Sequence, residues 1–305
     1  MPLDLSGSVA GVRFTAEGDI DTDVACRRCG YNLRGLLRDD RCPECGSPAV
    51  LALQGDRIRF GDPGWVDRLA KGVRLVVWGI VLAFLSGLAG AVSSTVILAT
   101  IVTVLASLMR CCGVWLLTSP DPSGLGEASY ATSRKVVRIA AVIGLVGAAV
   151  GGFGGSMALT LLTGTLGVAA TLAGVIEQIA TLLFLEKLCR RIPDKKLAGR
   201  ARVIRCGILF GYAFMLVGGI VTALTLATAG PSGIGAPVGL SAGALGCVMG
   251  VGGLTLLVFG ILYLLFMIRL GRALGVEARR ARELWSASAP ASPASPSGAE
   301  AAQPA

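Results

Sequence analysis

Four cysteines near the N-terminus are the strongest chemical signal in the chain. Cys26 and Cys29 are separated by two residues, as are Cys42 and Cys45, and a glycine follows each pair at once. Two tight turns of this kind bring four thiolates around a tetrahedral metal ion, and glycine permits the positive backbone dihedral that points amides at the sulfurs. The spacing predicts one zinc ion bound by Cys26, Cys29, Cys42 and Cys45.

Two other interpretations of the cysteines stay open at this point. A pair of disulfides suits an oxidising compartment, whereas zinc suits the reducing cytoplasm in which the topology below places this segment. A rubredoxin-like iron site is a minor alternative with the same ligands. Because four thiolates fill every position around a tetrahedral metal, we expect a structural site and no catalysis by the metal.

The residues around the cysteines carry a family resemblance. They read Cys-Arg-Arg-Cys-Gly-Tyr-Asn-Leu-Arg-Gly-Leu over 26–36 and Cys-Pro-Glu-Cys-Gly over 42–46. This pattern resembles the short zinc ribbon at the N-terminus of uncharacterised bacterial multi-span membrane proteins. The likeness covers residues 24–50 and reaches loosely through residues 62–65 into the first apolar stretch. It implies an architecture with four cysteine ligands and implies no activity.

The ribbon is close to electrically neutral. Residues 24–50 hold five arginines and three acidic residues, and four thiolates around zinc add two negative charges. Because Tyr31 is its only aromatic residue, the module lacks the basic, aromatic face of a nucleic-acid interface, and we expect no such partner. We expect Tyr31, Arg34 and Leu36 to form a contact surface for a cytoplasmic protein, unless Leu36 packs with Leu33 into the small core.

The ribbon module is predicted over residues 26–60, between two different flanks. Residues 1–25 show no clear period, so we expect a loosely ordered arm there. Residues 47–59 are expected to add one or two short strands. An Asp-Pro pair, typical of a helix cap and first turn, then predicts an interfacial helix over residues 61–72.

The rest of the chain has the composition of a membrane protein. Of its 305 residues, 53% are hydrophobic and 15% are charged, and the mean hydropathy is +0.72. These values exclude a soluble domain after residue 72. We therefore predict an all-α membrane protein, a six-helix transmembrane bundle over residues 73–276 with a small N-terminal four-cysteine zinc-ribbon module. Apolar runs of sufficient length predict the spans at about residues 73–92, 95–116, 136–157, 163–185, 204–227 and 243–268.

Basic residues predict the orientation of these spans. The chain has 28 Lys and Arg residues, and the connections after the first, third and fifth spans contain none of them. Because short cytoplasmic loops retain Lys and Arg, we expect a multi-pass protein of the bacterial inner (cytoplasmic) membrane with both termini inside, the first span serving as an uncleaved insertion signal. The basic loop 186–205 should contact anionic lipids. Residues 277–305 are expected to form a cytoplasmic tail, disordered from about residue 286.

Glu177 is the one acidic residue placed well inside a predicted span. An ionisable group at that depth is costly unless it is paired, protonated or hydrated. The carboxyl either serves transport or a proton relay, or stays protonated and hydrogen-bonds to a neighbouring helix. Arg110, in the second predicted span, either pairs with Glu177 or extends to the cytoplasmic surface.

Small residues recur at intervals of four in three of the spans. The spacing lines one face of each helix with glycine and predicts close packing inside the bundle rather than dimerisation. These residues are Gly147, Gly151 and Gly155, Gly207 and Gly211, and Gly246 and Gly250.

The sequence contains few residues that could act in catalysis. The chain has no histidine and no paired carboxylates within the spans that could act as acid and base. We therefore expect a non-enzymatic protein whose zinc ribbon is a structural or protein-binding scaffold module tethered to the membrane. The alternative is a small-solute or ion transporter or channel that depends on Glu177.

Overall fold

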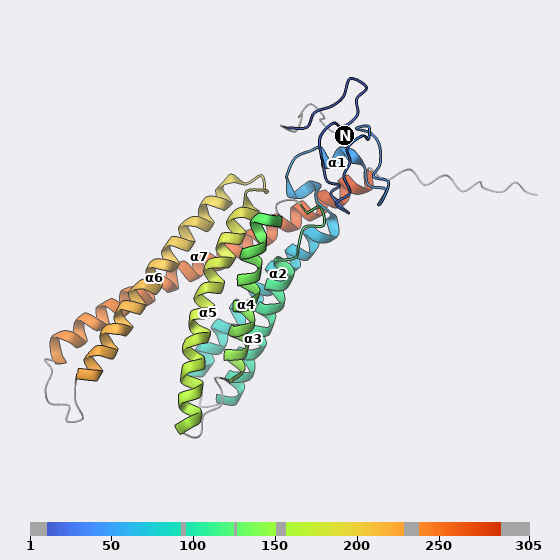
Figure 1. Ribbon diagram of the computed structural model, residues 1–305. Coiled ribbons are helices and arrows are strands. Elements are labelled where there is room, and N and C mark those ends of the chain that lie inside the picture. Colours follow the sequence, from blue (N-terminus) through green and yellow to red (C-terminus); the bar gives the residue numbers. More distant parts are fainter. Residues whose placement is uncertain (1–10, 93–95, 125–126, 151–156, 229–237, 288–305) are drawn as a thin grey trace, which may run out of the picture. The chain divides into compact units, whose positions relative to one another are not determined.

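The computed structural model describes residues 11–92, 96–124, 127–150, 157–228 and 238–287. The regular secondary structure within these ranges is helical. Seven α-helices and one 3-10 helix, with no named strand, occur in these ranges, which confirms the predicted all-α class for them. In chain order they are α1 (Ala49–Ala52), the 3-10 helix η1 (Ile58–Phe60), α2 (Pro63–Val92), α3 (Val96–Leu117), α4 (Glu127–Val150), α5 (Met157–Cys189), α6 (Lys195–Thr228) and α7 (Val238–Ala287) (Figure 1).

Five of the described helices contain a stretch long and apolar enough to cross a membrane. The stretches are Pro63–Gly87, Leu98–Leu117, Ala169–Cys189, Lys196–Val221 and Gly250–Ala287. The described part of α4 is not among them: it carries Arg134, Lys135 and Arg138, and the predicted span at 136–157 runs into residues outside the described ranges. The helices are those of a membrane protein, and the sixth span stays a prediction.

Two helices are longer than the sequence pattern indicates. α2 begins at Pro63 and continues without a break past residue 72, where the interfacial helix was expected to end. α7 runs for 50 residues and ends at Ala287 rather than near residue 268. Its last turns bury Ala278 and Ala281, so packing and good helix formers extend it beyond the apolar run.

The chain divides into two compact units. The first comprises residues up to Pro63, residues 121–125 and the chain from Glu277 onward. The second comprises residues 64–120 and 126–276. The cysteine module therefore forms one unit with the last turns of α7.

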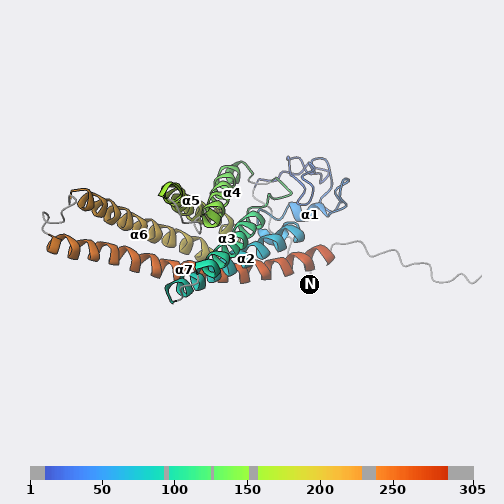
Figure 2. The same cartoon turned by 90° about the horizontal axis from the view of Figure 1, so that it is seen from below.

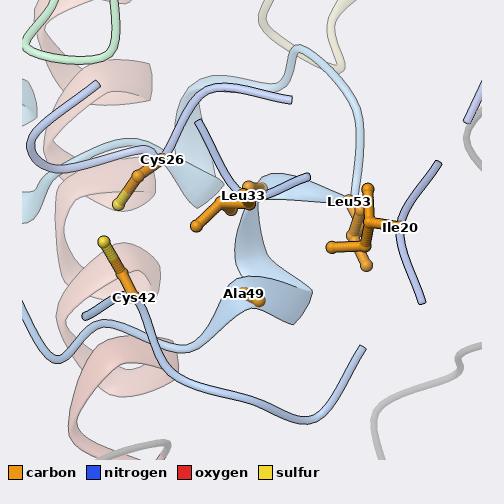
Figure 3. Close-up of a cluster of buried hydrophobic side chains, with 7 residues drawn as sticks. Ile20, Cys26, Leu33, Cys42, Ala49 and Leu53 are labelled. Carbon is orange, nitrogen blue, oxygen red and sulfur yellow. The ribbon is translucent and has the colours of Figure 1, made fainter. Parts of the chain in front are cut away.

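A small hydrophobic core holds the first unit together (Figure 3). Ile20 and Leu33 are almost fully buried in it, and two of the cysteines belong to the same cluster. The Ile20 amide donates to the Leu36 carbonyl at 3.0 Å, and the Leu33 amide donates to the Val24 carbonyl at 2.8 Å. The stretch expected to be a loose arm is thus, over residues 11–25, folded onto the cysteine module; residues 1–10 lie outside the described ranges.

The segment after the cysteines is helical where short strands were expected. α1 and η1 occupy it, and the backbone pairing near it is an isolated bridge between Arg41 and Pro48. Residues 49–52 read Ala-Val-Leu-Ala, in which Ala and Leu favour a helical turn over a pleated strand. The turn buries Ala49 and Leu51, so the strand expectation is wrong here.

Close approaches between helices shape the second unit. A Cβ atom added at Gly147 of α4 would overlap the side chain of Ala170 in α5, and one added at Gly207 of α6 would overlap Phe259 of α7. α6 and α7 lie side by side in both views (Figures 1 and 2). Of the other predicted glycines, Gly211 also meets α7, a Cβ at Gly250 would have no neighbour within 4 Å, and Gly151, Gly155 and Gly246 are outside the residues whose surroundings are described.

α2 and α3 approach each other through glycines that the spacing of four does not include. A Cβ atom at Gly72 would lie 2.5 Å from the backbone nitrogen of Leu117, and one at Gly79 would lie 2.9 Å from the carbonyl oxygen of Ala106. Because these neighbours are backbone atoms, a side chain can enter only if the helices separate.

We expect Gly72→Ala to lower the thermal stability of the purified protein in detergent. The added methyl group forces α2 and α3 apart at a cost of about 1–3 kcal/mol, which exceeds the gain in helix propensity of about 1 kcal/mol. Gly87→Ala, in the same helix but with no neighbour within 4 Å of its added Cβ, is the matched control. Equal melting temperatures for the two variants would contradict the close approach.

Candidate functional site

The four cysteines sit on two backbone turns of nearly the same geometry. In the first turn, the carbonyl of Cys26 accepts from the Gly30 amide at 3.0 Å, and the amide of Cys26 donates to the Tyr31 carbonyl at 2.7 Å. In the second, the carbonyl of Cys42 accepts from the Gly46 amide at 2.8 Å. Gly30 and Gly46 have φ values of 77° and 69°, a region that residues with a Cβ rarely adopt. Each turn therefore needs its glycine.

The two turns bring all four sulfur atoms together. The Sγ atoms of Cys26, Cys29, Cys42 and Cys45 lie within 4.8 Å of one another. Cys26 and Cys45 are 3.6 Å apart at sulfur, as are Cys29 and Cys42. A tetrahedron with zinc–sulfur bonds of about 2.3 Å has edges of about 3.8 Å, whereas a disulfide bond is about 2.05 Å long. The four free thiols therefore fit a single metal ion such as zinc.

Ser47 is a polar neighbour of the cluster that the sequence pattern does not single out. Its Oγ lies 3.1 Å from the sulfurs of both Cys26 and Cys45. Burial raises the pKa of the Cys26 thiol, but hydrogen bonds from the Ser47 hydroxyl and from backbone amides of the first turn outweigh it and lower the pKa to about 7. Burial raises the pKa of Cys42. Crowded thiols resist ionising together, and a divalent cation supplies the charge that lets them do so.

A buried arginine ties the first turn to the segment after α1. Arg27 is 4% exposed. Its guanidinium donates to the carbonyl of Gly55 and lies 3.6 Å from the carboxylate of Asp56. The positive charge of Arg27, which lies between Cys26 and Cys29 in the sequence, is thus paired with groups inside the module.

The C-terminal end of α7 belongs to the same unit. The indole nitrogen of Trp285 donates to the carbonyl of Gly61 at 3.1 Å. The guanidinium carbon of Arg28 lies 6.0 Å from the centre of the Trp285 ring, within range of a cation–π contact. The unit that contains the four cysteines therefore joins residues more than 200 positions apart in the chain.

The three residues expected to form the ribbon's contact surface have different environments. Tyr31 is 41% exposed. Arg34 is exposed as well, and its guanidinium lies 3.1 Å from Asp21 and 3.9 Å from Asp23. Leu36 is half-buried against the hydrophobic core. Tyr31 and Arg34 are available at the surface, whereas Leu36 contributes to the core.

The structure brings Glu177 and Arg110 together in the second unit. Oε2 of Glu177 lies 3.0 Å from Nη2 of Arg110, and Glu177 is 4% exposed. A Cβ atom at Gly144 of α4 would lie 3.3 Å from the same Arg110 nitrogen, so α4 covers the pair. Of the two environments that the sequence left open for Arg110, the structure has the one in which it pairs with Glu177.

A cavity of about 580 Å³ borders this ion pair. All six long helices contribute to its wall, and Arg110 and Glu177 line it. Tyr212 of α6 donates a hydrogen bond to Oε1 of Gln178 at 3.2 Å in the same wall. The polar residues at its border lie on α3, α5, α6 and, with Tyr263, on α7, and no local pattern in the sequence indicates that these four helices meet.

A second charged cluster lies where α5 ends and α6 begins. Glu186 is 6% exposed, and its carboxylate accepts hydrogen bonds from Arg190, Arg202 and Arg205 at 3.2, 2.9 and 2.8 Å. Three arginines around one carboxylate leave an excess of positive charge. The basic loop predicted at 186–205 therefore contains a fixed arrangement of guanidinium groups.

Comparisons of the chain with protein-family models, with curated proteins and with solved structures find no match. The resemblance to ribbon-bearing membrane proteins therefore rests on the cysteine motif. Long apolar helices and a four-cysteine cluster together define the class: a helical membrane protein with a candidate metal-binding centre.

Proposed function

We propose that this chain is a bacterial inner-membrane protein with six spans, both termini cytoplasmic, and a structural zinc ribbon that docks a cytoplasmic protein. The observation that carries the proposal is a four-sulfur cluster in a unit with its own hydrophobic core, adjoining long apolar helices in the chain. Four cysteine ligands complete a tetrahedral zinc site, so the metal stabilises a fold and has no free position for substrate. We propose no enzymatic activity.

Docking is tested by affinity co-purification from membranes. The double variant Cys26→Ser and Cys29→Ser should insert normally and lose a partner that the parent protein retains. Cys206→Ser with Cys247→Ser, two exposed cysteines in α6 and α7, is the matched control. A partner retained by the ribbon variant, or no specific partner for the parent, would reject the docking role.

Orientation is tested by fusion of a fluorescent reporter to the C-terminus. A reporter that folds only in the cytoplasm should fluoresce, because basic residues are retained on that side of the membrane. The same fusion in a chain cut after residue 230 places the reporter after the fifth predicted span, where fluorescence should be absent. Fluorescence from the shorter fusion would contradict the proposed topology.

Anionic lipid is the proposed partner of the arginines around Glu186. We expect Glu186→Gln to lower the melting temperature in neutral detergent and to make the protein more dependent on added phosphatidylglycerol. Without the carboxylate, the three guanidinium groups repel one another until lipid phosphate neutralises them. Each arginine near the membrane surface contributes about 1 kcal/mol to the binding of anionic lipid.

Asp194→Asn is the matched control for this prediction. It removes the same charge from the same loop, and Asp194 Oδ1 accepts only a backbone hydrogen bond from Lys196 in the described structure. Asparagine preserves such a cap. The same lipid dependence in both variants would show that net charge, and not the Glu186 cluster, governs the response.

Transport is a second candidate function, favoured by the location of Arg110 and Glu177 in the wall of a cavity. In this case Glu177→Leu should abolish proton or cation flux in proteoliposomes, while the protein still inserts and retains its metal. Unchanged flux, or no flux for the parent protein, would reject the role of Glu177 in transport.

A further inference from the structure

The cavity wall is charge-balanced. Among the described residues that line it, one cation and one anion are present, Arg110 and Glu177, and the others are neutral. Moving a net charge into a low-dielectric site is costly. A ligand with one charge of each sign could instead replace the Arg110–Glu177 pair by two ion pairs, and the site would stay neutral. The charge content therefore favours a ligand with no net charge.

The two members of the ion pair differ in access. The side chain of Arg110 is 37% exposed and that of Glu177 is 6% exposed. A guanidinium has five N–H donors, and Glu177 engages one of its nitrogens at 3.0 Å. Arg110 thus presents further donors to the cavity, in the planar arrangement that suits a carboxylate or phosphate group.

One end of the cavity, near Ala170, is lined mainly with small residues, most of them apolar; Thr171 is the polar residue beside Ala170. The α5 residues in its wall run along one face from Ala170 to Thr181, with Glu177 between them. Gly147 meets α5 at Ala170, and Ala83 and Ala106 also line the cavity. Gln178 and Thr181 lie on the other side of Glu177 along the helix. A ligand seated here would place a charged head at the ion pair and a short aliphatic tail among alanines.

We propose that this cavity binds a zwitterion that carries an acid group and an ammonium group on one short aliphatic molecule. The acid group binds Arg110, the ammonium group binds Glu177, and the aliphatic part lies against the small residues near Ala170. A free amino acid and the headgroup of a zwitterionic lipid share this chemistry. The inference names a ligand class for the second candidate function, but binding does not require that the ligand cross the membrane.

The test uses three probes that share the branched isobutyl group of leucine. Leucine carries both charges, 4-methylpentanoate carries only the acid group, and 3-methylbutylamine carries only the ammonium group. The full-length protein is placed in nanodiscs of phosphatidylglycerol, which lacks an ammonium group, and binding is measured by calorimetry. Leucine should bind at least about tenfold more tightly than either single-charge probe, because each of those leaves one protein charge unpaired.

A second experiment tests the lipid headgroup as the source of the zwitterion. Native mass spectrometry measures whether the protein retains phosphatidylethanolamine in preference to phosphatidylglycerol when it is taken from a mixed bilayer.

Two variants separate the site from the fold. The double variant Arg110→Gln and Glu177→Gln keeps the site neutral and polar, and it should lose binding of either zwitterion. Ala83→Leu keeps the ion pair and fills the apolar end at an exposed position, so it should weaken leucine binding by about tenfold or more.

Preference for either zwitterion, lost in the double variant, supports the proposal and identifies the source of the ligand. Equal binding of a single-charge probe, persistence of binding in the double variant, or no binding of leucine together with no retention of phosphatidylethanolamine would overturn it. Leucine binding without flux in proteoliposomes supports this inference and rejects transport, so the two can fail separately.

Discussion

The Cys42→Ser variant of the full-length protein should purify without bound metal, whereas Cys206→Ser should retain one zinc ion per chain. Cys42 is 1% exposed and its sulfur lies 3.6 Å from that of Cys29, so serine removes one of four converging ligands from a buried position. Structural zinc contributes about 10–16 kcal/mol of apparent binding energy to small domains of this kind. Metal content by mass spectrometry checks the result directly.

Loss of the metal should also expose the module to trypsin. Arg27 is buried against Gly55 and Asp56 in the folded module, and it becomes cleavable only when the two turns separate. Chelation of the parent protein should have the same effect as Cys42→Ser, and added zinc should reverse it for the parent alone. A metal-free parent that stays resistant, or a Cys42→Ser variant that still holds one zinc ion, would contradict a structural metal site. The full chain is the proper material, because Trp285 of α7 belongs to the same unit.

The candidate ligands could be predicted from the sequence because their geometry is local. Each pair of cysteines and its glycine lie within one turn, and turn chemistry depends on adjacent residues. Ser47 and the core residue Ile20 could not be assigned in the same way. Their roles arise from contacts with residues that lie more than ten positions away, such as those of Ser47 with Cys26 and of Ile20 with Leu36.

The apolar helices were predictable for a different reason. A membrane-spanning helix satisfies its own backbone hydrogen bonds, so length and hydropathy suffice to indicate it. Helix ends depend on packing: α7 continues to Ala287, where Ala281 is buried and the Trp285 indole donates a hydrogen bond to the Gly61 carbonyl. The pattern of glycines at intervals of four found only some of the contact faces: it included Gly147, Gly207 and Gly211 but omitted Gly72 and Gly79.

The Arg110–Glu177 ion pair could be predicted in part: its residues stand out in the sequence, but its geometry depends on packing. Charged residues inside apolar runs are conspicuous, so Glu177 and Arg110 could be named from the sequence. Their separation of 3.0 Å depends on how α3 and α5 pack, with α4 covering the pair at Gly144. No local pattern contains that distance.

Removing one member of this pair should destabilise the second unit more than removing both. Arg110→Gln leaves Glu177, which is 4% exposed, without its cation, and we expect a loss of about 3 kcal/mol in the free energy of unfolding. Glu177→Gln leaves Arg110 charged, but its side chain is 37% exposed and can extend toward water, so the loss should be smaller, about 1–2 kcal/mol. The double variant should stay within about 1 kcal/mol of the parent, because no uncompensated charge remains.

Thermal and denaturant unfolding in detergent, arranged as a double-mutant cycle, measures this coupling. Ile176→Val, on the adjacent residue of α5 with 51% exposure, gives the background of a mild change in the same helix. Additive losses for the two glutamine substitutions would mean that Glu177 and Arg110 contribute separately, as a protonated carboxyl and an arginine directed to the surface would. A double variant more stable than either single variant would instead require that the charges balance each other inside the helices, which is the property that the proposed binding of a zwitterion uses.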